Sequence, residues 1–394
     1  MCKVCVLTAT RAEYGLLRWL MEDIRADSSL ELQLVVTGAH LSPLFGETWR
    51  EIEADGFHID ARLEILPKSS ASPSDLTRSA GKCLNLLADS FAELSPDLLV
   101  VLGDRYELLP VCTAALLLDI PVAHISGGDV TEGAIDDAIR HAVTKLSSLH
   151  LVSSEEAQRR VLQMGEEPER VFLCGGPGLD NLRRLPQLTR SELAASLGLN
   201  VDNDWALLTW HPETRISLAE NMDVLRNILD VLGQWGKKGG LEVVATYANA
   251  DLGGKEINEH LEQAAAESPW LKVCSSLGQL RYVNMLRQVR FMLGNSSSAI
   301  FETPTLGLPA INIGERQKGR RLTPNIIQCG RSREALADAV NKIQSQKFPE
   351  ARQIPCPYGD GRFSEKALAA IKTGLGWGRK KLLTKRFVDL PPLP

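Results

Sequence analysis

Short apolar runs alternate with longer amphipathic segments along most of the chain, and this alternation limits the possible folds more than any other feature. A short apolar run is typical of a buried strand, and apolar residues at helical spacing indicate an amphipathic helix. Repeated strand, helix and strand units form parallel sheets covered by helices. The sequence therefore predicts an α/β protein. Its strands are expected at residues 4–8, 32–37, 98–102, 122–125, 149–152 and 171–174, and again at 205–210, 241–247, 271–274, 291–294 and 310–313.

The series pauses once, after the glycine-rich stretch 175–178, and then starts again. With 394 residues, of which 44% are hydrophobic, the chain is too long for one ordinary core and apolar enough to fill two. We expect one Rossmann-like domain at residues 1–178 and a second at 179–358, each with a doubly wound parallel sheet. Such sheets bind ligands outside the carboxyl ends of their strands, so the two are expected to face a cleft. Residues 359–394 are expected to form a last helix and a solvated tail with a basic run at 379–381.

The composition and the first residues exclude several classes of protein. The formal net charge of -5 gives no basic surface for nucleic acid. No apolar stretch reaches the length of a membrane span, and the chain starts with a strand rather than a signal peptide, so we expect a cytoplasmic protein without a membrane partner. Two of the eight cysteines, Cys2 and Cys5, have the spacing of a metal or redox pair, but a strand would put them on opposite faces. We therefore interpret both cysteines as structural, and we expect no metal and no cofactor in the protein.

Charged residues follow two predicted strands of the first domain. Arg11 begins the helix after residues 4–8, where backbone N–H groups and a guanidinium suit a diphosphate; a surface arginine is the alternative interpretation. The turn contains neither G-x-G-x-x-G nor G-x-x-x-x-G-K-[ST], which argues against a dinucleotide or ATP loop. Asp104 and Arg105 follow residues 98–102. Because charge at a buried strand end is costly, we interpret Asp104 as catalytic or ligand-orienting, with a helix cap as the alternative.

An acidic loop with two glycines follows the strand at 122–125. Gly127 and Gly128 would let the backbone approach a ligand closely. Asp129 and Asp136 are candidates for acid–base catalysis, which needs neighbouring carboxylates of unequal pKa. A divalent metal is the alternative, which we do not favour because hard-cation loops space their ligands more regularly. For Asp136 there is also a structural alternative, an ion pair with the arginine one helical turn further on.

The second domain contributes a histidine, hydroxyls and cations after its strands. His211 follows a strand and is a candidate acid or base near neutral pH, although a lone histidine is a weak signal. Another strand leads through three serines into a helix, where Ser296 and Ser297 would form a cradle for a pyrophosphate. A helix cap explains one serine but does not require three. Glu302 is placed to reach a ribose diol, and Arg316 adds a cation beside the cradle.

These motifs, in this order, resemble those of the hydrolysing UDP-N-acetylglucosamine 2-epimerases of sialic acid biosynthesis. The resemblance implies the two-domain architecture called GT-B, with UDP bound by the second domain. It also implies an anti elimination of UDP that gives a glycal, followed by addition of water and reprotonation from the other face. The matching motifs span nearly the whole chain and are TRAEYG from Thr10, GDRYE from Gly103, GGDVTEGAIDDAIRH from Gly127, HPET from His211, GNSSS from Gly294 and ERQKGR from Glu315.

The resemblance also implies roles for particular residues. The acid–base carboxylates of the family match Asp104 and Asp136, and its cleft histidine matches His211. A nucleotide-sugar substrate and a homo-oligomer are the partners that it implies. The residues that match the UDP contacts are Arg11, Arg105, Asn249, Ser296, Ser297, Glu302 and Arg316.

The sequence departs from the family pattern at Ser126. Many members have Glu directly before the Gly-Gly pair, where it serves as a catalytic group. A hydroxyl with an ordinary pKa cannot replace a carboxylate in proton transfer. We therefore expect Asp129 to supply the missing acid, with Glu132 as the weaker candidate.

The expected function is the conversion of UDP-N-acetylglucosamine and water to N-acetylmannosamine and UDP. One alternative is the same reaction on a UDP-2,4-diacetamido-2,4,6-trideoxy sugar of the legionaminic acid route, since a change at sugar C4 or C6 is read by a few side chains that the sequence does not locate. A second is a GT-B glycosyltransferase, which needs fewer acids than the loop at 129–137 supplies. A third is a non-catalytic nucleotide-sugar sensor, which has no use for Asp104, Asp136 and His211 together.

Overall fold

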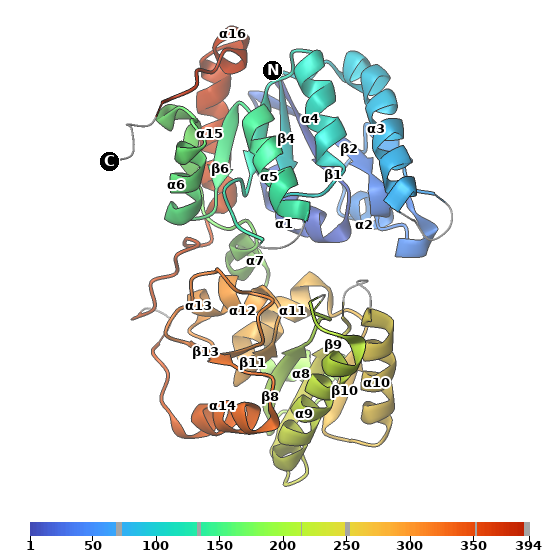
Figure 1. Ribbon diagram of the computed structural model, residues 1–394, viewed down its shortest axis with the longest axis vertical. Coiled ribbons are helices and arrows are strands. Elements are labelled where there is room, and N and C mark those ends of the chain that lie inside the picture. Colours follow the sequence, from blue (N-terminus) through green and yellow to red (C-terminus); the bar gives the residue numbers. More distant parts are fainter. Residues whose placement is uncertain (68–72, 132–134, 214, 249–252, 351–352, 390–394) are drawn as a thin grey trace. The chain divides into compact units, whose positions relative to one another are not determined.

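The computed structural model describes residues 1–67, 73–131, 135–213, 215–248, 253–350 and 353–389. The chain forms two compact units (Figure 1). Unit 1 consists of Met1–Asp180 and Pro357–Pro394, and unit 2 of Asn181–Cys356. Each unit contains one parallel sheet, so the predicted fold class of two Rossmann-like doubly wound domains is confirmed. No helix in the described part of the chain is long and apolar enough to cross a membrane.

Unit 1 has a sheet of seven parallel strands in the order β3-β2-β1-β4-β5-β6-β7. The sequence analysis missed β3, an edge strand of only three residues with an exposed residue at its centre. The strands are β1 (Cys2–Thr8), β2 (Leu30–Thr37), β3 (Ala61–Leu63), β4 (Leu98–Leu102), β5 (Val122–Ile125), β6 (Leu149–Val152) and β7 (Val171–Leu173).

Helices cover both faces of this sheet because successive residues of each strand point to opposite faces. In β1, Val4 and Val6 belong to the core under α1 and α15, whereas Cys5 and Leu7 belong to the core under α3, α4 and α5. Cys2 is exposed and Cys5 buried, so the two do not form the pair that their spacing suggests. The helices are α1 (Arg11–Ala26), α2 (Trp49–Ala54), α3 (Pro73–Leu94), α4 (Leu108–Leu117), α5 (Ile135–Leu146), α6 (Glu155–Gln163), α15 (Phe363–Gly376) and α16 (Arg379–Leu383), with 3-10 turns η1 (Gly38–Leu41), η2 (Pro43–Phe45) and η3 (Pro168–Arg170).

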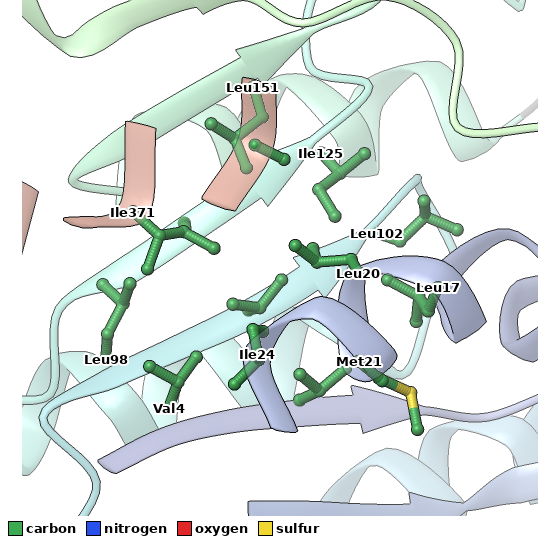
Figure 2. Packing of buried hydrophobic residues seen from close by; sticks show 14 of the residues in the cluster. Val4, Leu17, Leu20, Met21, Ile24, Leu98, Leu102, Ile125, Leu151 and Ile371 are labelled. Carbon is green, nitrogen blue, oxygen red and sulfur yellow. The ribbon is translucent and has the colours of Figure 1, made fainter. Parts of the chain in front are cut away.

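The C-terminal segment is part of unit 1, although most of its described residues after α15 are exposed. Figure 2 shows Ile371 of α15 among side chains of the strands and of α1. Further on, Leu382 of α16 is only 1% exposed. The buried Arg170 donates to the carbonyl of Lys381 over 2.7 Å, and the ammonium of Lys385 lies 2.9 Å from the carboxylate of Glu166. Lys381 and Lys385 thus pair with Glu169 and Glu166 of unit 1, and the local sequence alone does not reveal these partners.

Unit 2 has six parallel strands in the order β10-β9-β8-β11-β12-β13. The sequence analysis missed β13, a half-exposed edge strand. The strands are β8 (Asp204–Thr209), β9 (Leu241–Thr246), β10 (Leu271–Cys274), β11 (Phe291–Gly294), β12 (Ala310–Ile313) and β13 (Ile326–Cys329). The helices are α8 (Arg190–Leu197), α9 (Leu218–Gly236), α10 (Gly254–Ala266), α11 (Gly278–Gln288), α12 (Ser298–Phe301), α13 (Thr303–Leu306) and α14 (Arg333–Ser345), and α7 (Leu179–Arg184) runs from unit 1 into unit 2.

Candidate active site

The strand order of each sheet contains one switch point, where ligands of open α/β sheets bind outside the carboxyl ends. It lies between β1 and β4 in unit 1 and between β8 and β11 in unit 2. We call the loops after β1, β4 and β5 the unit 1 site, and the loops after β8, β11 and β12 the unit 2 site. Most of the predicted functional residues lie in these loops or at the start of the helix that follows. Asn249 and Glu132 lie outside the described residues.

Asp104, directly after β4, forms an ion pair with Arg140 of α5. The side chain of Arg140 is 7% exposed and that of Asp104 is 22% exposed. Arg140 also donates to the hydroxyl of Thr131 over 2.9 Å. Asp104 is not the cap of the next helix, because α4 begins at Leu108 and has Glu107 at its N-cap position. The alternative interpretation as a cap is therefore wrong, and the guanidinium holds the Asp104 carboxylate at the strand end.

Arg105 lies between two buried carboxylates that the sequence analysis did not single out. Its Nη2 donates to Oε1 of Glu107 over 2.8 Å, and its Nε lies 4.0 Å from Oε1 of Glu13. Glu13 completes a capping box with Thr10, a T-x-x-E pattern that is visible in the sequence. Burial raises the pKa of Glu13 to about 7, and the Arg105 charge opposes this rise. Arg105, a predicted UDP contact, is thus oriented by acids on both sides.

Arg11 lies at the surface, at the first position of α1. Its Nε donates to the carboxylate of Glu51 over 3.0 Å, and both side chains are about half exposed, at 47% and 46%. An exposed ion pair of this kind contributes little stability. A diphosphate can therefore compete with Glu51 for this guanidinium.

The loop after β5 is packed tightly against its own unit. A Cβ on Gly128 would lie 2.3 Å from the carbonyl oxygen of Ala157, and a Cβ on Gly127 would lie 2.9 Å from the hydroxyl of Thr144. The glycines therefore permit close approach to α6 and α5, whereas the sequence analysis expected them to permit approach to a ligand. Ser126 has a positive φ of 64°, a conformation that non-glycine residues rarely adopt.

The two acids predicted in this region differ in their surroundings. Oδ1 of Asp129 accepts a hydrogen bond of 2.6 Å from the hydroxyl of Ser153, which follows β6 and is buried. Asp136 is the second residue of α5 and is partly exposed. Among the described residues, no three His, Cys, Asp or Glu side chains form a group that could hold a metal ion.

The buried His124 supports the strand end that carries Asp104. Its Nε2 donates to the carbonyl oxygen of Gly103 over 2.8 Å, and its Nδ1 lies 3.2 Å from the hydroxyl of Thr144. Burial lowers the pKa of His124 to about 4, so the ring is neutral at pH 7. Sequence analysis did not select this residue, since a histidine within a strand carries no distinguishing signal.

In unit 2, a buried asparagine holds the backbone of His211. Oδ1 of Asn295 accepts from the N–H of His211, and Nδ2 of Asn295 donates to the carbonyl of His211, each over 2.8 Å. Burial and, to a smaller extent, the charge of Arg316 lower the pKa of His211 to about 4. The imidazole is therefore neutral at pH 7 and can accept a proton or a hydrogen bond.

The serine-rich turn after β11 begins at a glycine that cannot be replaced. Gly294 has a φ of 131°, and a Cβ there would lie 1.9 Å from the carbonyl oxygen of Thr209. The helix that follows, α12, is only four residues long, so its dipole is smaller than the sequence suggested. Ser297 is exposed and its side chain caps no backbone N–H, whereas Oγ of Ser296 accepts from the N–H of Ser298 over 3.3 Å.

Glu302 and Arg316 flank this turn. Burial raises the pKa of Glu302. The guanidinium of Arg316, in the loop after β12, donates to the backbone carbonyl of Asn295 over 3.2 Å, and Gln317 donates to the same oxygen over 2.8 Å. The turn after β11 and the loop after β12 are thus joined, close to His211.

Comparison with known proteins agrees with these features. The family model for UDP-N-acetylglucosamine 2-epimerase matches residues 22–372. The GDP/UDP-N,N'-diacetylbacillosamine 2-epimerase (hydrolyzing) of Campylobacter jejuni is 39% identical over 349 residues, which are 88% of this chain and 89% of that protein. The UDP-N,N'-diacetylbacillosamine 2-epimerase (hydrolyzing) of Legionella pneumophila is 32% identical over 371 residues, 94% of this chain and 96% of that protein.

The fold is shared with solved structures as well. The UDP-GlcNAc 2-epimerase of Neisseria meningitidis, solved with bound UDP-GlcNAc, superposes with a TM-score of 0.73 over 94% of this chain and all of that chain, at 17% identity. At that identity the likeness concerns the fold alone, and it agrees with the expected GT-B architecture.

The matching family model and the two relatives identify the chain as an enzyme that acts on nucleotide sugars. The chain belongs to the UDP-N-acetylglucosamine 2-epimerase family, as its motifs indicated. Its activity is that of a hydrolysing 2-epimerase of nucleotide sugars.

Proposed function

We propose that the substrate is a UDP-linked 2,4-diacetamido-2,4,6-trideoxy sugar, UDP-N,N'-diacetylbacillosamine, and that the products are UDP and the free 2-epimer. The names of the two relatives at 39% and 32% identity support this choice. UDP-N-acetylglucosamine, which the sequence analysis expected, is the second candidate and is favoured by the name of the family. Both substrates carry an acetamido group at C2, so both allow the same chemistry.

The reaction needs two proton transfers at C2 and a stabilised leaving group. A base removes the C2 proton while UDP departs from C1 with the bonding electrons, which leaves a glycal. Water then adds to C1, and an acid returns a proton to C2 from the opposite face. General acid–base catalysis of this kind requires carboxylates that are held near the reacting carbon.

The main support for this reaction is that two carboxylates are fixed in the loops that follow two neighbouring strands. β4 and β5 are paired. Asp104 lies just after β4, and Asp129 lies in the tight loop after β5. Arg140 holds Asp104 and Ser153 holds Asp129. We assign proton transfer to Asp104, Asp129 and Asp136, with His211 as a further proton acceptor or donor.

We assign the binding of UDP mainly to arginine side chains and serine hydroxyls. Arg316 and the serines after β11 would hold the diphosphate in the ground state and in the transition state alike, as Arg105 and Arg11 would in unit 1. Glu302 would bind the ribose diol. The full set assigned to UDP is Arg11, Arg105, Asn249, Ser296, Ser297, Glu302 and Arg316.

One assay tests the reaction and the choice of substrate together. The purified protein is incubated in D2O, without an acceptor, with each of the two UDP-sugars, and the released sugar is identified by NMR. We expect the free 2-epimer of the diacetamido sugar with deuterium at C2, and slower release from UDP-N-acetylglucosamine. Faster release of N-acetylmannosamine would favour the second candidate. Turnover that appears only when an acceptor is added would contradict both in favour of glycosyl transfer.

The remaining expectations stay predictions. We expect full activity in the presence of a chelator, because arginines rather than a metal would neutralise the phosphates. A cytoplasmic location and a homo-oligomer are likewise predictions, which fractionation and light scattering would test.

A further inference from the structure

Two buried asparagines hold the same loop after β8 in the same way. Asn295, fully buried, binds both the N–H and the C=O of His211 over 2.8 Å. Asn221 of α9, 3% exposed, accepts from the N–H of Glu213 over 2.9 Å and donates to the C=O of Glu213 over 3.1 Å. Each carboxamide thus satisfies one donor and one acceptor of a single loop residue.

Asn295 differs from Asn221 in what its own backbone binds. Its carbonyl oxygen accepts from Nη1 of Arg316 over 3.2 Å and from Nε2 of Gln317 over 2.8 Å. Gln317 is 3% exposed, so this junction is inside the unit. One residue therefore contacts His211 through its side chain and Arg316 through its main chain.

We propose that Asn295 is a positioning residue that fixes the place of His211 relative to Arg316. This inference rests on the proposed function, in which His211 serves proton transfer and Arg316 binds the diphosphate. Through Asn295, a phosphate that orders Arg316 also orders the loop that carries His211. Asn221 holds the same loop through Glu213 and Ser217, so it serves as a matched control.

Only a carboxamide can make both bonds to His211. An aspartate at position 295 has the same shape but offers two acceptors, so one oxygen would face the carbonyl of His211 without a proton between them. The resulting repulsion would displace His211 while the core remains filled. Asn221→Asp also replaces the carboxamide NH2 by a carboxylate oxygen and introduces a similar buried charge, but at Glu213, at the other end of the loop.

The first experiment compares Asn295→Asp with Asn221→Asp. We expect Asn295→Asp to reduce kcat about a hundredfold, as a misplacement of about 1 Å can, and to weaken UDP binding about tenfold. Asn221→Asp should leave both quantities within about twofold, with a similar fall in Tm, because the two exchanges are matched in chemistry. Equal losses of kcat in the two variants would overturn the inference.

A double-mutant cycle separates this inference from the proposed function. If Asn295 acts through His211, then His211→Ala costs much less turnover in the Asn295→Asp background than in the wild type. Additive losses would overturn the inference even if His211 proved essential. If His211→Ala retains turnover and Arg316→Ala retains affinity in the wild type, the proposed function fails instead.

A measurement on the unaltered protein removes any dependence on the folding of the variants. The amide of His211 is bonded to Asn295 and the amide of Glu213 to Asn221, so hydrogen exchange reports each contact separately. We expect UDP to slow exchange at His211 about tenfold or more and at Glu213 less than about twofold. Equal slowing at both amides, or none at His211 when UDP is bound, would overturn the inference.

Discussion

Asp104 of the unit 1 site and His211 of the unit 2 site are held by different kinds of contact. In unit 1 the contacts are ion pairs: Arg140 pairs with Asp104, and Arg105 pairs with the buried Glu107. In unit 2, neutral amides hold the backbone around a neutral His211, through Asn295. The difference follows from the chemistry that each unit is assigned. Paired charges fix carboxylates for proton transfer, whereas an amide adds no negative charge that would weaken the attraction of nearby cations for phosphate.

The largest effect is expected from neutralising the carboxylates of unit 1. Asp104→Asn and Asp136→Asn should each reduce kcat about a hundredfold to ten-thousandfold, since proton transfer depends on them. UDP affinity should change only a few-fold, because phosphate binding does not require these acids. Steady-state kinetics and calorimetry measure the two quantities. Near-normal turnover in both variants would show that the acid–base assignment is wrong.

Asp129 tests whether the loop after β5 supplies the acid that Ser126 lacks. Asp129→Asn should cost as much turnover as Asp104→Asn, and adding Ser126→Glu should recover part of it. The recovery should be incomplete, because Ser126 has a positive φ that a larger side chain tolerates poorly. As a matched control, Ser153→Ala removes the hydroxyl that holds Asp129 and should cost only about tenfold. A fully active Asp129→Asn would mean that this acid is structural.

Acid should destabilise unit 1 through His124. The folded pKa of about 4 lies below the ordinary value of 6.5, so the unfolded state binds more protons between these values. The stability that His124 contributes is therefore present above pH 6.5 and is lost as the pH falls toward 4, up to about 3 kcal/mol for this buried ring. Urea unfolding at pH 7, 5.5 and 4.5 measures the slope. His124→Asn should flatten it, and an unchanged slope would contradict this origin.

The smallest effect is expected for single contacts to UDP in unit 2. Ser297→Ala and Arg316→Ala should weaken UDP binding about threefold to thirtyfold, the range of one neutral or charged hydrogen bond. At saturating substrate, kcat of Ser297→Ala should stay within a few-fold, because this hydroxyl is assigned to bind the ground state and the transition state alike. Calorimetry that finds unchanged UDP affinity would remove both residues from the site.

The fold was largely predictable because its signal is local. Buried parallel strands such as β4 are continuous apolar runs, and their periodicity is visible without knowledge of their neighbours. β3 and β13 were not predicted, because short, half-exposed edge strands lack such an apolar run. The C-terminal helices were placed in a separate segment because nothing in their own sequence indicates that they pack on the sheet of unit 1.

The candidate site was predictable in its residue types but not in its contacts. Asp104 and His211 could be selected because each follows a buried strand, where burying a polar side chain costs free energy unless it has a partner or a function. Asn295 lies in the GNSSS motif, but the sequence analysis assigned a binding role only to the serines of that motif. The close packing of Gly127 and Gly128 against α5 and α6 was also missed, since it depends on helices that come later in the chain.

By itself, the sequence determined the class of fold, the order of the motifs and the chemical groups available after each strand, since periodicity and local spacing carry that information. The tertiary structure alone decided which groups hold one another. Arg140 reaches Asp104 from 36 residues away, and Asn295 reaches His211 from 84 residues away. Such pairs arise because the strand order makes neighbours of β4 and β5, and of β8 and β11, and that order is a property of the packed sheet rather than of any local segment.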